Sequence, residues 1–196
     1  MQIEYEATFL DVDKDEIRKQ LIAIGAKCIF EERLMKRVVF KVDKNPDHEF
    51  VRVRDEGDKV TCTYKSLTPG EGDIASVKEL ETQVGDFDIM KNILLSSGLT
   101  QKAYQETLRE NWELEGVEFM IDTWPGLHTF IEIEANNEKL VKDYSQKLGF
   151  DYSQAVFGTV GAVYLKELGL SRSEINSIPV ITFDDPPKGK KQHKHH

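Results

Sequence analysis

Polar and apolar side chains alternate with a period of two in several segments of the chain. The pattern is clearest in residues 3–9 and 59–65, where every second residue is apolar. Such alternation is typical of strands with one buried and one polar face, and antiparallel pairing suits strands of this kind. Eight strands are predicted, at about residues 3–9, 28–43, 50–54, 59–65, 76–84, 101–114, 117–124 and 129–135.

Helices are predicted where apolar residues recur at helical spacing. The first begins near Asp13, because its carboxylate and Glu16 three residues later can form a capping-box-like start, and Gly25 ends it. Three more are predicted, at about residues 87–97, 137–148 and 157–168, and each is followed by a glycine.

Short turns between consecutive strands favour an antiparallel arrangement over a parallel α/β sheet, whose crossovers need more residues. Asp55-Glu56-Gly57-Asp58 is predicted to join two strands as a hairpin, and Trp124-Pro125-Gly126-Leu127 to join another two. The predicted fold is α+β: a closed eight-stranded antiparallel β-barrel with helices packed outside and room inside for one ligand. We expect a single domain over residues 1–170, followed by a C-terminal extension over residues 171–196 with a solvated basic tail.

The charge and hydropathy of the chain limit the classes of partner that are expected. A formal net charge of −9 argues against general affinity for nucleic acid or anionic membranes. No apolar run approaches the ~18 residues of a membrane span, and the first six residues do not have the pattern of a secretory signal. We therefore expect a cytoplasmic protein with a small-molecule partner; the sequence leaves monomer and homodimer both open.

Glutamates recur two residues apart, a spacing that puts both carboxylates on one face of a strand. Three such pairs lie on predicted strands: Glu4/Glu6, Glu79/Glu81 and Glu132/Glu134. A fourth, Glu113/Glu115, stands beside Gly116 and is predicted to form a turn. One pair alone is usually a solvated strand face. Three pairs indicate a site, because like charges on one wall repel unless cations lie between them.

Basic residues with matching phase lie on other predicted strands: Arg52 and Arg54, Lys65 on the hairpin partner, and Arg109. Guanidinium groups bind phosphate oxygens in bidentate fashion. These cations could instead neutralise the glutamates in surface ladders, each worth ~0–1 kcal/mol. The combination favours a site in which carboxylates hold Mg²⁺ or Mn²⁺ and the basic wall holds phosphates.

Taken in chain order, these motifs resemble the CYTH or triphosphate tunnel metalloenzyme superfamily, which includes thiamine triphosphatases, inorganic tripolyphosphatases and class IV adenylate cyclases. The resemblance covers about residues 2–168 and rests on Glu4-Tyr5-Glu6-Ala7-Thr8, Arg52-Val53-Arg54, Lys65, Lys78-Glu79-Leu80-Glu81, Arg109, Ile121-Asp122, Phe130-Ile131-Glu132-Ile133-Glu134 and Ala162-Val163-Tyr164-Leu165. It implies a tunnel of eight antiparallel strands with helices outside.

The resemblance also implies roles for individual residues. The catalytic carboxylates would be Glu4, Glu6, Glu132 and Glu134, which would bind the metal together with Asp122. The triphosphate would be bound by Arg52, Arg54, Lys65 and Arg109. Glu79 and Glu81 would complete the substrate-binding wall, by holding a second metal or by orienting its cations.

One position departs from the family signature Glu-x-Glu-x-Lys, because Thr8 stands where the lysine is expected. Lys36 or Arg37 could supply the missing cation. The favoured hypothesis is Mg²⁺- or Mn²⁺-dependent hydrolysis of inorganic tripolyphosphate, thiamine triphosphate or a nucleoside triphosphate. An adenylate cyclase forming cyclic AMP and a catalytically weak triphosphate- or polyphosphate-binding module are the alternatives.

Overall fold

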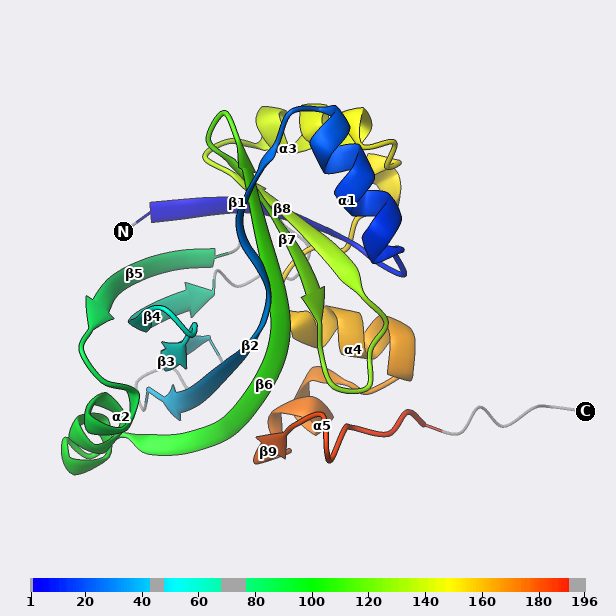
Figure 1. The fold of residues 1–196 in the computed structure, drawn as a ribbon. Coiled ribbons are helices and arrows are strands. Elements are labelled where there is room, and N and C mark those ends of the chain that lie inside the picture. The colour runs from blue at the N-terminus through cyan, green and yellow to red at the C-terminus, as the bar shows by residue number, and fades with distance from the viewer. Residues whose placement is uncertain (1, 43–47, 68–76, 191–196) are drawn as a thin grey trace, which may run out of the picture.

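The structure of the chain, a computed structural model, describes residues 2–42, 48–67 and 77–190. Within these ranges the side chains of residues 2–4, 67 and 77 are not described. The described part forms one strongly curled sheet with helices on its outer side (Figure 1).

The predicted strands and helices are all present, with ends that differ from the prediction by a few residues. The strands are β1 (Gln2–Phe9), β2 (Lys27–Lys41), β3 (Glu49–Asp55), β4 (Val60–Leu67), β5 (Val77–Val84), β6 (Thr100–Leu114), β7 (Val117–Thr123), β8 (Phe130–Ala135) and β9 (Val180–Ile181). The helices are α1 (Lys14–Ala23), α2 (Phe87–Ser96), α3 (Glu138–Lys147), the short 3-10 helix η1 (Tyr152–Gln154), α4 (Val160–Leu168) and α5 (Arg172–Asn176).

Strand pairing in the sheet follows the order β2-β3-β4-β5-β1-β8-β7-β6-β9, and β2 also pairs with β6. All pairings among β1 to β8 are antiparallel. The predicted α+β fold, with eight antiparallel strands curled into one sheet and helices outside, is confirmed.

The sheet gains a short strand that the sequence pattern does not predict. β9 pairs in parallel with β6, with Val180 beside Tyr104. A two-residue strand is too short to display a period of two, so only the structure reveals it. The assignment of residues 171–196 to an extension stays a prediction. In the structure, Ile175 and Ile181 of this segment are buried against Tyr164 and Phe130, and residues 191–196 lie outside the described part.

Local signals in the sequence set the ends of the helices and the tightest turn. The backbone N–H of Glu16 donates to Asp13 Oδ1 at 2.9 Å, which confirms Asp13 as the cap of α1. Glu115 and Gly116 both have positive φ, 53° and 77°, as a two-residue hairpin turn between β6 and β7 requires. The predicted turn at Glu113/Glu115 is therefore confirmed.

One hydrophobic cluster lies on the outer face of the sheet, beneath α1 and α3. On β8, Ile131 and Ile133 are fully buried in a cluster that includes Leu21 of α1 and Val141 of α3. A second cluster packs α4 against the end of β7, and its members Trp124 and Tyr164 also line the inside of the curl. Since successive residues of a strand point to opposite faces, this burial turns the alternate polar positions of β8 toward the inside of the curl. Among the described helices, none is long and apolar enough to cross a bilayer.

Candidate functional site

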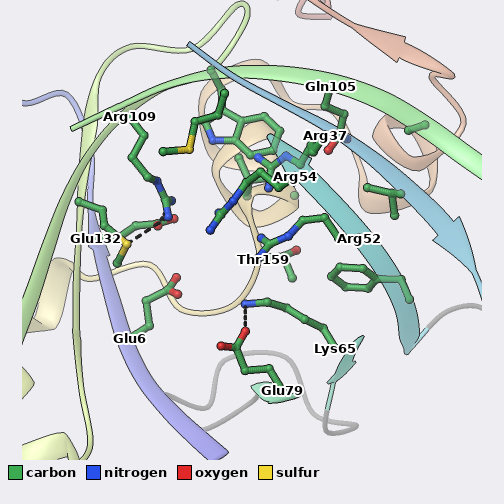
Figure 2. Close-up of a pocket in the computed structure, with 18 of the residues that line it drawn as sticks. Glu6, Arg37, Arg52, Arg54, Lys65, Glu79, Gln105, Arg109, Glu132 and Thr159 are labelled. Atoms are coloured by element: carbon green, nitrogen blue, oxygen red, sulfur yellow. Dashed lines mark hydrogen bonds and ion pairs between the residues drawn. The ribbon is translucent and has the colours of Figure 1, made fainter. Parts of the chain in front are cut away.

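The inside of the curled sheet contains a cavity of about 360 Å³ (Figure 2). Its charged lining includes acidic and basic residues from all eight predicted strands. The acidic side chains are Glu6, Glu56, Glu79, Glu81, Glu118, Glu132 and Glu134, and the basic ones are Arg37, Arg52, Arg54, Lys59, Lys65, Lys102, Arg109 and Arg172. The structure thus brings together every predicted site residue whose side chain it describes, except Asp122. The side chain of Glu4 lies outside the described part, although its backbone belongs to β1.

Glutamates of β1, β7 and β8 form one wall of the cavity. Glu134 lies opposite Glu6 of β1 and opposite Glu118 of β7 in the strand register. Burial, reinforced by the neighbouring glutamates, raises the pKa of Glu134 to about 7. Burial and the Asp122 carboxylate likewise raise the pKa of Glu132. The wall therefore concentrates negative charge that a cation would stabilise.

The opposite wall carries cations that carboxylates of the same wall hold in place. Lys65 Nζ lies 2.9 Å from Glu79 Oε2 (Figure 2). Arg52 Nη2 lies 3.5 Å from Glu81 Oε2. Glu79 and Glu81 of β5 thus form ion pairs with the cations of this wall, and their role in binding stays a prediction.

Hydrogen bonds within and beside β3 and β4 fix the two arginines of the basic wall. Arg52 Nη2 also donates to Thr63 Oγ1 at 3.2 Å. Arg54 Nη2 donates to Glu56 Oε1 at 2.6 Å, and Glu56 belongs to the predicted hairpin turn. A residue in a turn is not part of a strand's alternating pattern. The contact of Glu56 with Arg54 therefore could not be predicted from the sequence.

Asp122 does not line the cavity, contrary to its expected place among metal ligands. It is fully buried behind Arg109, whose Nε donates to Asp122 Oδ1 at 2.7 Å and whose Nη2 contacts Oδ2. The same Nη2 lies 2.7 Å from Glu132 Oε2 (Figure 2). Asp122 thus orients Arg109 between itself and Glu132. Cross-strand register explains the difference, because Asp122 of β7 stands directly opposite Arg109 of β6.

Of the two cations considered for the missing lysine, Arg37 and Lys36, only Arg37 lies beside the cavity. Arg37 lines the cavity, whereas Lys36 is exposed and lies on the other side of the sheet beside Asp86 and Phe87 of the α2 region. Thr8 is 3 % exposed and lies opposite Glu132 in the register. Phase along β2 could have located Arg37, since the neighbouring Val38 belongs to the core on the outer face.

The donor set fits a hard divalent cation. Mg²⁺ and Mn²⁺ take oxygen ligands, retain several waters and need only one or two carboxylates from the protein. Glu6 and Glu134, cross-strand neighbours in the cavity, supply such oxygens. Among the described residues no group of three His, Cys, Asp or Glu side chains is arranged to hold an ion, so substrate oxygens and water would have to complete the coordination.

Removing the charge of Glu134 is expected to stabilise the metal-free protein at alkaline pH. The folded pKa of about 7 exceeds the ordinary 4.5, so the folded state binds more protons between these values and stability falls as pH rises through this window. Glu134→Gln should raise Tm in EDTA by about 5 °C at pH 8, with little effect at pH 4.5.

Thermal denaturation of both proteins at the two pH values measures this difference. Glu113→Gln, which alters a carboxylate at the β6–β7 turn, serves as the control. A Tm difference for Glu134→Gln that is equal at both pH values would contradict the assigned pKa.

Three comparisons place the chain among known proteins. The family model described as the CYTH domain matches residues 43–152, more than half of the chain. A curated protein of Methanocaldococcus jannaschii, whose name suggests an adenylate cyclase, is 29% identical over 149 residues, which is 74% of this chain and 81% of the relative.

Solved structures share the fold at lower identity. The PH1012 protein of Pyrococcus horikoshii matches with a TM-score of 0.64 and 22% identity, over 79% of this chain and 94% of that one. A protein from Hippeastrum matches with a TM-score of 0.56 and 16% identity, over 86% of this chain and 96% of that one; it is described as an adenylyl cyclase candidate with a dominant triphosphatase activity.

Proposed function

The chain belongs to the CYTH domain family, and on this premise we propose that it hydrolyses a triphosphate compound with the help of Mg²⁺ or Mn²⁺. The proposal rests on one observation: a basic wall and an acidic wall face each other across the same cavity. Guanidinium and ammonium groups line one side, and carboxylates that include two with raised pKa values line the other. A linear triphosphate bound to a divalent cation has the complementary charges.

The basic wall supplies the affinity for phosphate. Arg52 is 7 % exposed and Lys65 lies inside the same cavity, so their interaction with an anion is screened little by water. Their carboxylate partners on β5 hold the two cations in place before the substrate arrives. Positioned cations of this kind stabilise the charge that spreads over phosphoryl oxygens during transfer.

The carboxylate wall would hold the metal ion. Glu6 and Glu134 would contribute oxygens, and Glu132 would connect this wall to Arg109 through its ion pair with that guanidinium. When bound, the divalent ion polarises a phosphoryl oxygen and orients a water molecule.

Cyclisation of ATP is the second candidate, and the name of the M. jannaschii relative favours it. The triphosphatase activity attributed to the Hippeastrum protein favours hydrolysis. The two reactions differ in their products, orthophosphate for hydrolysis and cyclic AMP with pyrophosphate for cyclisation.

A product assay tests the proposal. Purified protein is incubated with Mg²⁺ or Mn²⁺ and, separately, inorganic tripolyphosphate, thiamine triphosphate and ATP. We expect metal-dependent orthophosphate release from at least one of them. Cyclic AMP as the main product would favour the cyclase, and binding without turnover would leave a triphosphate-binding protein.

Arg52→Ala is expected to weaken binding of the triphosphate by roughly 10- to 100-fold, because a buried charge-assisted contact to phosphate is lost. The measurement is the dependence of initial rate on substrate concentration, together with titration calorimetry under conditions without turnover. An unchanged KM and Kd would remove Arg52 from the binding site.

A further inference from the structure

Arg37 differs from Arg52, Arg54 and Arg109, three of the other arginines that line the cavity. Arg52 contacts Glu81, Arg54 contacts Glu56, and Arg109 contacts both Asp122 and Glu132. Within the described residues Arg37 forms no ion pair. Its positive charge therefore has no direct carboxylate partner in this part of the chain.

The surroundings of Arg37 make this charge unfavourable in the empty cavity. The register sets Arg37 directly opposite Arg54, and like charges in this position repel. Burial, followed by the guanidinium groups of Arg52, Arg54 and Arg109, lowers the pKa of Arg37 well below its usual range. The Nε atoms of Arg37 and Arg52 are both buried without a hydrogen-bond partner in the described part. An anion in the cavity, which both arginines line, would relieve the repulsion between the guanidinium groups.

Trp124 holds the Arg37 side chain in this position. The guanidinium carbon of Arg37 lies 4.0 Å from the centroid of the Trp124 ring, a cation–π contact. Trp124 is 4 % exposed and is fixed by the core cluster that contains Tyr164. The guanidinium is thus held by an aromatic ring, which leaves its hydrogen-bond donors available for a ligand.

The N-terminus of α4 faces the same cavity. Gly158, Thr159, Val160 and Gly161 contribute to the lining, and Figure 2 shows Thr159 near Arg37, Arg52 and Arg54 in this view. Thr159 is the N-cap of α4, but its side chain makes no capping hydrogen bond. The first N–H groups of a helix have no carbonyl partner within it and favour anions.

We propose that Arg37 and the N-terminus of α4 form a subsite for the free terminal phosphate of the substrate. This assignment rests on the proposed function, because it concerns one end of the triphosphate bound in the cavity. It gives the bound molecule a direction: the unsubstituted phosphate lies between Arg37 and α4, and the rest of the chain of phosphates extends toward Lys65 and Glu79. The preferred ligand class is a linear polyphosphate, which has two free ends, or a triphosphate ester, which has one.

Arg37→Gln tests the subsite through two effects of opposite sign. Without ligand, Tm should rise, because the substitution removes a positive charge that lies among other guanidinium groups and has no ion pair within the described residues. Binding of inorganic tripolyphosphate should weaken roughly 10- to 100-fold, because contacts of a charged donor are lost. Calorimetric titration and thermal denaturation measure both. Lower Tm without ligand, or unchanged affinity, would overturn the assignment.

Arg33→Gln is the matched control on the same strand. Arg33 also stacks on an aromatic ring, with its guanidinium carbon 3.8 Å from the centroid of Phe30, but it pairs with Asp58 at 2.9 Å and does not line the cavity. Its replacement should leave tripolyphosphate affinity unchanged. Equal losses of affinity in the two variants would show a general charge effect and overturn the specific role of Arg37.

Thr159→Asp tests the helix end separately. Aspartate is a favourable N-cap, so the fold is retained, but its carboxylate would repel a phosphate at this position. Tripolyphosphate affinity should fall roughly tenfold or more, whereas Thr159→Ser should retain it. Unchanged affinity in Thr159→Asp would exclude α4 from the subsite.

Cyclic trimetaphosphate distinguishes recognition of an end from recognition of phosphate in general, because it has no terminal phosphate. Its binding should be weaker than that of tripolyphosphate and insensitive to Arg37→Gln. Equal sensitivity would overturn the end-specific assignment. If wild-type protein binds neither compound while remaining folded, the proposed function itself fails. If Arg52→Ala loses binding and Arg37→Gln does not, only the subsite fails.

Discussion

Glu132→Gln is expected to lower metal-dependent phosphate release by roughly 10²- to 10³-fold while the protein remains folded. Glu132 joins the two kinds of charge in the cavity, because it lines the cavity together with Glu6 and Glu134 and also lies 2.7 Å from Arg109 Nη2. Glutamine keeps the shape and can accept a hydrogen bond from Arg109. It cannot supply the negative charge that a divalent cation requires.

Activity at several Mg²⁺ and Mn²⁺ concentrations, with circular dichroism as the check on folding, measures the effect of Glu132→Gln. Glu113→Gln is the control, since Glu113 belongs to the Glu-x-Glu pair at the β6–β7 turn and accepts from the N–H of Gly116. It should retain full activity. Wild-type turnover and an unchanged metal requirement in Glu132→Gln would exclude this carboxylate from the site.

Asp122→Asn is expected to destabilise the protein by about 3 kcal/mol, with a Tm lower by about 6–12 °C. Asp122 is fully buried, and both of its oxygens contact Arg109. Asparagine offers one acceptor oxygen and turns an N–H₂ group toward a guanidinium, so Arg109 keeps only Glu132 as a charged partner. The loss should be the same in EDTA and in excess Mg²⁺, because the effect arises from the buried ion pair.

Thermal denaturation with and without metal measures the Asp122→Asn effect. Asp58→Asn is the matched control, because Asp58 also pairs with an arginine, at 2.9 Å, but its side chain is 62% exposed. Surface pairs of this kind contribute about 0–1 kcal/mol. A destabilisation by Asp122→Asn that appears only in the presence of metal would return Asp122 to the set of metal ligands.

The strands could be predicted from the sequence because their two faces differ strongly in polarity. In β8, Ile131 and Ile133 alternate with Glu132 and Glu134, so the same period of two locates the strand and assigns its inward face. The hairpin turn at Gly116 has local chemistry that a short window of sequence reveals. The strand β9 could not be predicted, since it depends on a contact with Tyr104 about 76 positions earlier in the chain, a separation that local patterns do not cover.

The residues of the candidate site could be predicted where charged side chains occupy the inward positions of a strand. Arg52, Arg54 and Lys65 have the required phase and line the cavity. Asp122 also has an inward phase, but whether such a residue reaches the cavity or stands behind another side chain depends on its cross-strand neighbour. Arg37 was one of two adjacent candidates, and the phase of β2 separates it from Lys36, because Lys36 shares the outer face with Val38.

The difference between the two faces of β8 also determines which sequence changes the strand can tolerate. The outward residues maintain the core and the inward residues carry the chemistry, so substitutions on the inner face can alter ligand preference with little effect on packing. Deleting or inserting a single residue within the strand would have the reverse effect, because every side chain beyond the change would exchange faces. Diversification of the cavity is therefore expected to proceed by substitution at constant strand length, with changes of length confined to the connecting loops.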